Sequence, residues 1–537
     1  MTDNDSIKTG IAGLDEVLQN GIPRSNMILV QGSAGAGKSL LGMEFIYRGI
    51  TEHNENGIIV VFETRPDKLI RDGKQFGWDL AKLELENKLK IVFTSPQVLD
   101  SELRSPDSLL LEIASEMGAR RIFIDGIGLL RPLSPVGVPL PLNGPGSYRE
   151  LLQQLLEGMH RENLTTMLSH ELGSLPDSLA TLEVATFLAD TVIEVSHDRH
   201  NCRGHRTLEI IKSRGQNYVA GKHTLQINDG RGLEVFRRVQ APLFRPSEQP
   251  TSSAKRSVIG VPALDALIGG GLFDGSTTMV VGISGAGKTV LATQLLLEGA
   301  KGGKRGLLIS LDEHPSQIIR NAGTLGLDLK NQIDAGMVHI FYESPQELEV
   351  DAHYARIIQT IEKYNIQRLV IDGVTSYSTA LDDQRTYRDF FHALVAYSKY
   401  HLLTTFFNYE NPEMLGISSY MPEFPVSSIV DNIILLSLVE LGSSLHRCIA
   451  VVKARGCKHE FDTREFVIRE GGISLIPVDA QANLPALPIE SYSSLLSRAP
   501  TRMSPRQNSL INPTPLIRKA TTPAAKPGSK RPPTKLI

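Results

Sequence analysis

The sequence predicts an α/β protein with two similar halves, each built around a mainly parallel β-sheet, followed by a disordered C-terminal tail. The first observation behind this prediction is an internal repeat, in which segments of the first half recur about 250 residues later. The second is the alternation of short apolar runs with stretches of helical periodicity in both halves. The third is an abrupt change of composition near the end of the chain. Apolar runs that alternate with helices are typical of a parallel sheet covered by helices on both faces.

The internal repeat consists of four segments that occur in the same order in both halves. The displacement is 250 positions for the first two pairs and shrinks to 241 for the last, which indicates that the first half carries small extra loops. A period of this length indicates a duplicated domain and is too long for a solenoid repeat. The matching pairs are 10–15 with 260–265, 32–39 with 282–289, 123–126 with 370–373, and 212–215 with 453–456.

Apolar runs of strand length and stretches of helical spacing predict the elements in chain order. In the first half, the apolar run 27–30 leads into a glycine-rich turn, and residues 40–50 follow it with helical spacing. The further strand-like runs are 58–62 and 122–124 in the first half, and 307–311 and 369–371 in the second.

Composition predicts the domain limits. We expect a first domain over 1–239, a linker rich in Pro, Ser and charge over 240–256, a second domain over 257–479, and the tail over 480–537. Residues 481–537 hold ten prolines and too little apolar surface to offset the entropy cost of ordering, so we expect disorder. Nine Lys or Arg and one acid, Glu490, give the tail a charge of +8. This leaves −11 for residues 1–480, because the whole chain carries −3.

The overall composition excludes several classes of protein. The chain has 537 residues, of which 41% are hydrophobic, enough to bury a sizeable core. Three cysteines without a Cys-x-x-Cys pair exclude a disulfide scaffold and argue against a zinc ribbon. The N-terminus is polar and acidic, unlike a secretory signal, and no apolar run approaches the ~20 residues of a membrane span. We therefore expect a soluble cytoplasmic protein.

Each half carries the phosphate-binding pattern Gly-x4-Gly-Lys-[Ser/Thr] between an apolar run and a helical one. Glycines allow the backbone to form a nest of N–H donors at a helix N-terminus, where anions bind. The lysines, Lys38 and Lys288, would reach the β- and γ-phosphates of a nucleotide. The alternative is a glycine-rich turn without a nucleotide. The predicted ATP-binding residues are Gly32, Ser33, Ala34, Gly35, Ala36, Gly37, Lys38 and Ser39, and Gly282, Ile283, Ser284, Gly285, Ala286, Gly287, Lys288 and Thr289.

A magnesium ion would be held by the hydroxyls of Ser39 and Thr289 together with an acid at the end of a neighbouring strand. Asp125 and Asp372 each close an apolar strand. An Asp at such a place is otherwise a helix cap or a turn residue, but its occurrence at matching places in both halves favours the metal-binding role.

Hydrolysis further requires a carboxylate that polarises the attacking water. Glu63 follows an apolar strand in the first half, and Asp312 and Glu313 stand at the equivalent place in the second. The alternative is that these acids cap the helices that begin near Pro66 and Pro315.

This set of motifs resembles the KaiC family of RecA-superfamily ATPases over nearly all of residues 7–478. The features that carry the resemblance are the opening segment 9–15, both phosphate loops, the acidic element after the next strand, the Lys-x-Arg-Gly segments and the duplication. The resemblance implies two tandem RecA-like P-loop NTPase domains that bind ATP and Mg²⁺. It also implies a homohexameric double ring with ATP between subunits.

The resemblance assigns further roles by position. Lys212 and Arg214, and Lys453 and Arg455, match the residues that would reach the phosphates of a neighbouring subunit, where an added positive charge favours phosphoryl transfer. The alternative is a solvated strand face. Ser427 and Ser428 match adjacent autophosphorylation sites; otherwise they are ordinary turn residues.

The sequence departs from the family pattern at the acidic element, where KaiC has a Glu-Glu pair in each half. Here the first half has Glu63 followed by Thr64, so hydrolysis there is still expected. In the second half Asp312 is shorter by one methylene, and whether Asp312 or Glu313 acts is left open. The tail also differs from KaiC, so clock partners that bind there are not carried over.

Three functions are consistent with these features. The first is an ATPase and Ser/Thr autokinase that acts as a signalling or timing switch through unidentified protein partners. The second is a nucleic-acid-dependent ATPase of the RecA or helicase type, since the fold alone does not separate them. The acidic body argues against nucleic acid, although the basic tail could bind phosphates. The third is a nucleotide-gated scaffold with little turnover.

Overall fold

The computed structural model describes residues 6–104, 108–130, 142, 147–173, 176–198, 204–240, 253–381, 383–411, 426–441, 444–459 and 462–477. The predicted tail, 480–537, lies outside the described residues, and so does most of the predicted linker. Among the described residues, no helix combines the length and the apolar character needed to cross a membrane.

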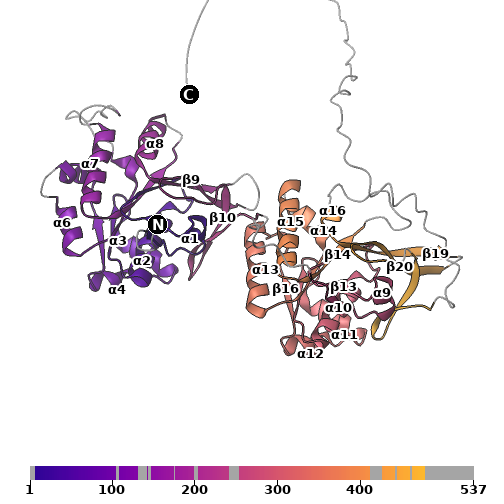
Figure 1. Ribbon diagram of the computed structural model, residues 1–537. Helices are drawn as coiled ribbons and strands as arrows, with labels where there is room; N and C mark the ends of the chain where they lie inside the picture. The colour runs from indigo at the N-terminus through magenta and orange to yellow at the C-terminus, as the bar shows by residue number, and fades with distance from the viewer. Residues whose placement is uncertain are drawn as a thin grey trace, which may run out of the picture. The chain divides into compact units, whose positions relative to one another are not determined.

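The first half alternates strands with helices up to β8 and then continues with strands alone (Figure 1). Its strands are β1 (Ser6–Ile7), β2 (Ile22–Pro23), β3 (Met27–Gly32), β4 (Gly57–Val61), β5 (Leu89–Phe93), β6 (Arg121–Asp125), β7 (Thr165–Glu171), β8 (Thr191–His197), β9 (Arg206–Ser213), β10 (Lys222–Asn228) and β11 (Gly232–Phe236). Its helices are α1 (Leu14–Val17), α2 (Lys38–His53), α3 (Pro66–Gln75), α4 (Leu80–Leu85), α5 (Pro96–Arg104), α6 (Leu109–Glu116), the 3₁₀ helix η1 (Ile127–Leu129), α7 (Tyr148–Arg161) and α8 (Pro176–Leu188).

The second half repeats this plan. Its strands are β12 (Arg256–Ser257), β13 (Leu272–Phe273), β14 (Thr277–Gly282), β15 (Gly306–Ser310), β16 (Val338–Tyr342), β17 (Arg368–Asp372), β18 (Thr404–Glu410), β19 (Asn432–Leu441), β20 (Ser444–Ala454), β21 (Arg464–Arg469) and β22 (Gly472–Leu475). Its helices are α9 (Pro262–Leu267), α10 (Lys288–Lys301), α11 (Pro315–Thr324), α12 (Leu329–Asp334), α13 (Val350–Tyr364), α14 (Val374–Ala380), α15 (Gln384–Tyr400) and α16 (Val426–Ile429).

Within the described residues, each half contains one nine-stranded sheet, and the two sheets have the same strand order. The first runs β5-β4-β6-β7-β3-β8-β9-β10-β11, and the second runs β16-β15-β17-β18-β14-β19-β20-β21-β22. Pairing is parallel from β5 to β8 and from β16 to β19, and antiparallel beyond them. The strands β3 and β14, which precede the glycine-rich loops, therefore lie in the interior of their sheets.

Both faces of the first sheet are covered. Alternate residues of β3 point to opposite sides, so Ile28 and Val30 join a core cluster with Phe45 of α2. Leu29 belongs to a different cluster, together with Leu151 of α7. This two-sided burial explains why β3 reads as an uninterrupted apolar run instead of an alternating one.

The predicted strands and helix agree with the structure to within a few residues. The run 58–62 falls on β4, 122–124 lies within β6, and 307–311 falls on β15. The predicted helix 40–50 lies inside α2, which begins earlier, at Lys38. The structure thus confirms an α/β fold with two mainly parallel sheets.

Candidate nucleotide sites

The glycine-rich loops connect the interior strands to the helices α2 and α10. Gly37 and Gly287 are the N-caps of these helices, with φ of 113° and 108°. An added Cβ would be strained at such a φ, so the loop requires glycine at this position. The loops consequently present backbone N–H groups at a helix N-terminus, as an anion-binding site requires.

The lysines that follow these glycines fold back over their own loops. Lys38 is only 8% exposed, and its Nζ donates to the Ser33 carbonyl at 2.8 Å. Lys288 Nζ donates to the carbonyls of Gly282 and Ile283, each at 2.9 Å. Burial lowers the pKa of both lysines, and neighbouring carboxylates act in the opposite direction. A bound polyphosphate would supply the same countercharge as these carboxylates.

A hydroxyl and a carboxylate meet at the predicted metal position in each half. Ser39 Oγ donates to Asp125 Oδ1 at 3.0 Å, and Thr289 Oγ1 donates to Asp372 Oδ2 at 2.7 Å. Burial raises the pKa of Asp372, although hydrogen bonds oppose this shift. Oxygen donors of this kind suit Mg²⁺, which is usually held by one or two protein ligands together with phosphates. The residues present therefore fit the ion.

Each aspartate has a second hydrogen-bond partner, which the sequence motifs do not predict. Ser169 Oγ from β7 donates to Asp125 Oδ1 at 2.5 Å, and Asn408 Nδ2 from β18 donates to Asp372 Oδ1 at 3.0 Å. The two residues occupy matching places in the repeat, each the fifth residue of its strand. Glu171 ends β7 and contributes to the field at Lys38.

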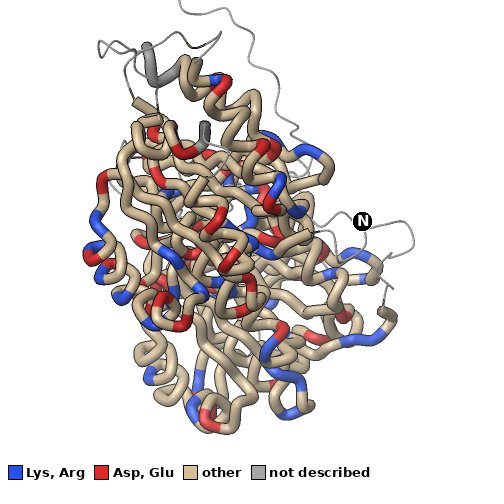
Figure 2. The backbone as a smooth tube through the Cα atoms, turned by 90° about the vertical axis from the view of Figure 1, so that its left-hand side faces the viewer, with Lys and Arg blue, Asp and Glu red and all other residues tan. Residues whose placement is uncertain are grey.

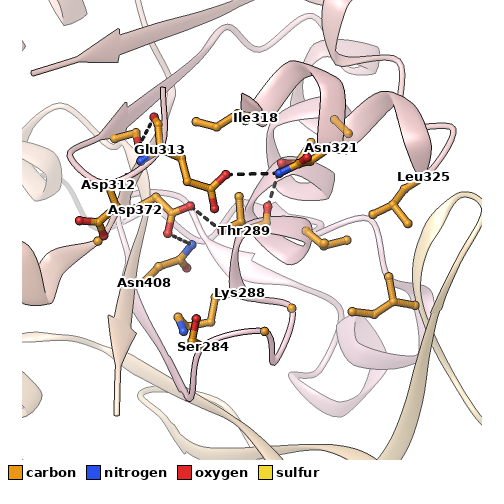
Figure 3. Close-up of a pocket in the computed structure, with 18 of the residues that line it drawn as sticks. Ser284, Lys288, Thr289, Asp312, Glu313, Ile318, Asn321, Leu325, Asp372 and Asn408 are labelled. Atoms are coloured by element: carbon orange, nitrogen blue, oxygen red, sulfur yellow. Dashed lines mark hydrogen bonds between the residues drawn. The ribbon is translucent and has the colours of Figure 1, made fainter. Parts of the chain in front are cut away.

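The predicted acids reach the same cavities as the loops. In the first half Glu63 is exposed and lines a cavity of about 730 Å³ together with Lys38, Ser39 and Asp125. In the second half a cavity of about 400 Å³ is lined by acids and by P-loop residues (Figure 3). Those acids are Asp312, Glu313, Asp372 and Glu410.

The two adjacent acids of the second half differ in their contacts. Ser376 Oγ, from α14, donates a short hydrogen bond to Asp312. Glu313 Oε2 is 3.5 Å from Asn321 Nδ2 (Figure 3). Burial raises the pKa of Glu313, and the negative charges of Asp372 and Asp312 raise it further. Glu313 therefore holds a proton more readily than an ordinary glutamate does.

Comparison with known proteins decides the family. The model of the KaiC ATPase family matches residues 7–240 and 258–480. The chain belongs to the KaiC ATPase family. Its two halves are tandem RecA-like domains, as the sequence predicted.

The curated relatives match almost the whole chain. The circadian clock oscillator protein KaiC of Thermosynechococcus vestitus is 30% identical over 504 residues, which cover 93% of this chain and 92% of the relative. The KaiC protein of Synechococcus elongatus is 29% identical over 512 residues, 94% of each chain. That of Nostoc sp. is 29% identical over 507 residues, covering 93% of this chain and 92% of the relative.

The basic pairs of the KaiC pattern lie on the antiparallel part of each sheet. In the first half Lys212 Nζ donates to the Thr186 carbonyl at 3.0 Å, and Arg214 Nη2 donates to the Phe187 carbonyl at 3.1 Å. Burial lowers the pKa of Lys212, and the charge of Arg214 lowers it further. Neither Lys212 nor Arg214 is among the described residues that line the cavity of the same domain.

The second pair has equivalent contacts. Lys453 Nζ donates to the Val430 carbonyl at 2.7 Å, and Arg455 Nη2 donates to the Ser428 carbonyl at 3.0 Å. Ser428 is exposed in α16, and the side chain of Ser427 lies outside the described residues. Arg455 thus contacts the backbone of the predicted phosphorylation segment. Neither Lys453 nor Arg455 is among the described residues that line the second cavity.

Proposed function

We propose that the protein binds Mg-ATP in both domains and hydrolyses it. The observation that carries this proposal is the recurrence, in both domains, of a P-loop lysine beside a hydroxyl–aspartate pair. A single pair of this kind could be structural, but both copies lie in a cavity with a further acid. Membership of an ATPase family supports the same reaction.

The side chains divide the chemistry as follows. Lys38 and Lys288 bind the phosphate oxygens, while Ser39 with Asp125 and Thr289 with Asp372 hold Mg²⁺. The ion, when bound, neutralises charge on the phosphates. The three side chains of each site position the triphosphate, and positioning accounts for much of the rate in phosphoryl transfer.

A carboxylate then accepts the proton of the attacking water. In the first domain this is Glu63, which is exposed toward the cavity. In the second domain the hydrogen bond from Ser376 occupies Asp312, so we assign the role to Glu313, whose raised pKa makes it a stronger proton acceptor than an ordinary glutamate.

We propose that the sites are completed in trans within a homohexamer. Lys212 with Arg214, and Lys453 with Arg455, would lie against the nucleotide of an adjoining subunit. Supply of these charges by a neighbour would make turnover depend on assembly. The position of each pair, away from the described lining of its own cavity, supports this arrangement.

We further propose that the second domain phosphorylates Ser427 or Ser428, so that the protein acts as a signalling or timing switch. A serine hydroxyl near the γ-phosphate of a neighbouring subunit would compete with water as the acceptor. The phosphate would add negative charge beside Arg455 and alter partner binding at that surface. The match to circadian clock oscillator proteins supports this role.

The test is incubation of the purified protein with Mg-ATP, followed by mass spectrometry of phosphorylated sites. We expect phosphate at Ser427 or Ser428 in the wild type and none in Lys288→Ala. Lys38→Ala is the matched control, because it disables the other domain by the same change. Absence of phosphate in all three proteins would remove the kinase role, while release of inorganic phosphate would still report the ATPase.

One observation favours a second function, that of a scaffold gated by nucleotide binding: Ser376 donates a hydrogen bond to Asp312. If Glu313 does not replace Asp312, the second domain becomes a nucleotide-gated scaffold with little turnover. Phosphate release by the Lys38→Ala protein separates the two cases, since only the second domain acts in it.

A nucleic-acid motor is less well supported. Figure 2 shows Lys and Arg interspersed with Asp and Glu along the described chain. Residues 1–480 carry a net −11. Salt-sensitive stimulation of ATP turnover by single-stranded DNA would reverse this assignment.

A further inference from the structure

Each domain has a buried arginine at the first residue of an interior strand, on the edge of the sheet away from the phosphate loop. Arg121 begins β6 and Arg368 begins β17, and they are 0% and 3% exposed. A Cβ added to Gly49 of α2 would lie 2.4 Å from Arg121 Nε. One added to Gly299 of α10 would lie 2.7 Å from Arg368 Nε. Nη1 of each arginine also donates to a carbonyl of the same helix, so the two arginines occupy equivalent places in the repeat.

In the first domain a carboxylate of the chain neutralises the buried charge. Arg121 Nε donates to Glu55 Oε2 at 2.7 Å, and Arg121 Nη2 lies 2.6 Å from the same oxygen. Arg24 Nη1 donates to the other oxygen, Glu55 Oε1, at 2.9 Å. Because a buried charge without a partner is costly, a counter-ion is expected beside an arginine at this place.

The second domain has the reverse pair of charges at these positions. Lys304 takes the place of Glu55, since the N–H of each bonds to the carbonyl of the equivalent helix glycine, at 2.8 and 2.9 Å. Asp274 takes the place of Arg24, and its Oδ1 lies 3.0 Å from Lys304 Nζ. The pair is thus preserved with its signs exchanged. The exchange removes the carboxylate that the buried arginine has in the first domain.

Arg368 is left without this partner. Among the described residues, nothing bonds to its buried Nε, the atom that donates to the carboxylate in the first domain. Two of the acids that act on its charge are engaged by lysines, Asp274 by Lys304 and Glu298 by Lys301 at 3.0 Å. In the described part of the second domain, Arg368 therefore lacks the close counter-ion that the first domain provides.

A cavity of about 310 Å³, named here the basic cavity, opens beside Arg368. Its described lining holds four positive side chains and one negative one: Arg256, Lys301, Lys304 and Arg368, and Glu298. At the matching positions of the first domain, the uncharged Ser6 and Thr51 stand in place of Arg256 and Lys301. The second domain thus carries more positive charge at the place where it lacks the carboxylate.

Arg256 is held at the basic cavity by contacts that include no carboxylate. Its Nη1 donates to the Gly271 carbonyl at 2.6 Å and to the Ile268 carbonyl at 3.2 Å. Its Nη2 donates to Cys457 Sγ at 3.2 Å, and its guanidinium lies 4.1 Å from the centre of the Phe273 ring. A guanidinium fixed in this way loses little freedom when it binds a ligand.

We propose that the basic cavity binds inorganic phosphate. The phosphate oxygens accept from the Arg368 guanidinium and the Lys304 ammonium, so the ligand supplies the negative charge that Glu55 supplies in the first domain. Phosphate suits the cavity because it carries up to two negative charges and because a guanidinium matches pairs of its oxygens. The cavity lies at the amino ends of the parallel strands, whereas the P-loops follow the carboxyl ends. The site is therefore separate from the nucleotide sites, and it does not rest on the proposed function.

Hydrogen exchange locates the ligand. The full-length protein carries Lys38→Ala and Lys288→Ala, so that the P-loops compete less for phosphate. Exchange is compared in sodium phosphate and in sodium chloride of equal ionic strength. At a phosphate concentration ten times its Kd, exchange in the peptide 299–306 should slow roughly ten-fold, and exchange in the equivalent first-domain peptide, 49–57, should not change. Equal slowing in both peptides, or none in either, would overturn the proposal.

A charge swap tests the groups that bind. Lys304→Glu together with Asp274→Arg rebuilds the arrangement of the first domain and keeps the net charge of the chain, so that it alters the site without altering long-range electrostatics. Titration calorimetry should detect one phosphate per chain in the reference protein, and the swap should weaken this binding at least about ten-fold. No binding in the reference protein, or an unchanged affinity after the swap, would contradict the proposal.

A single substitution covers the case in which the swapped protein does not fold. Lys304→Gln removes one donor and leaves Arg368 in place, so it should weaken phosphate binding about ten-fold. Lys330→Gln removes a lysine that does not line the basic cavity and is the matched control. Equal affinities for the two glutamine variants would count against the site.

Discussion

Substitution of Gly287 by alanine offers the sharpest test of the phosphate-loop geometry. Its φ of 108° is unfavourable for any residue with a Cβ, and the added atom would lie 2.9 Å from Ile468 Cδ1 of β21. Gly285 in the same loop is a matched control. Its φ is 76°, and an added Cβ would meet no atom within 4 Å.

The two substitutions should therefore differ in cost. A left-handed backbone costs an alanine about 1–2 kcal/mol, and displacing the Ile468 side chain from its rotamer adds about 0.5–1.5 kcal/mol. Gly287→Ala should cost about 1.5–3.5 kcal/mol in the binding-competent loop, which raises the Kd for nucleotide roughly 10- to 300-fold. Gly285→Ala should raise it roughly 5- to 30-fold.

The assay is titration of a fluorescent ATP analogue with Mg²⁺ into proteins whose first site is disabled by Lys38→Ala. Adding Ile468→Val to Gly287→Ala removes the Cδ1 atom, so it should recover the part of the loss that is due to the contact and leave the backbone strain. Equal affinities for the Gly285 and Gly287 variants, or no recovery with Ile468→Val, would refute the geometry on which the cost is based.

Three further predictions concern turnover and stability. Arg455→Ala should reduce ATP turnover about ten-fold or more while nucleotide binding is retained, since the charge acts on the phosphoryl group in transfer; loss of binding alone would count against the trans role. Glu313→Gln should lower ATP turnover in the second domain about 100-fold, measured by phosphate release. Asp312→Asn should change this turnover less than about five-fold, because Asp312 already accepts a hydrogen bond from Ser376. A larger loss for Asp312→Asn than for Glu313→Gln would move the proton-accepting role to Asp312. Burial raises the pKa of Glu44 in α2 to about 7. Glu44→Gln should therefore stabilise the first domain by about 1–3 kcal/mol at pH 8 and by little near pH 4.5; thermal unfolding at the two pH values checks this, and an equal effect at both would contradict the raised pKa.

Short-range patterns were sufficient to predict the phosphate loops and their aspartates. The P-loop residues and Asp125 or Asp372 follow apolar strands, and the parallel arrangement brings the ends of β3 and β6, or of β14 and β17, to the same edge of each sheet. The repeat strengthened each assignment because both copies had to agree. The roles of these residues in catalysis stay predictions.

Contacts between residues distant in the sequence were not predictable in the same way. The bonds of Ser169 to Asp125 and of Ser376 to Asp312 depend on which strands become neighbours. The hairpin formed by β10 and β11 is an intermediate case. Its strand β10 alternates buried His223 and Leu225 with more exposed residues, a period-two signal that predicts a strand. The hydrogen bond that its Leu233 N–H donates to Glu44 nevertheless required the register of β10 with β11 and the packing of that hairpin on α2.

The number of nucleotides bound per chain tests the central claim most directly. Under saturating Mg-ATP, the wild-type protein should retain two nucleotides per chain, and Lys38→Ala and Lys288→Ala should each retain one. Quantification of the nucleotide released on denaturation, or native mass spectrometry, gives this number. One nucleotide or none in the wild type, or an unchanged two in either lysine variant, would contradict the assignment of two equivalent P-loop sites.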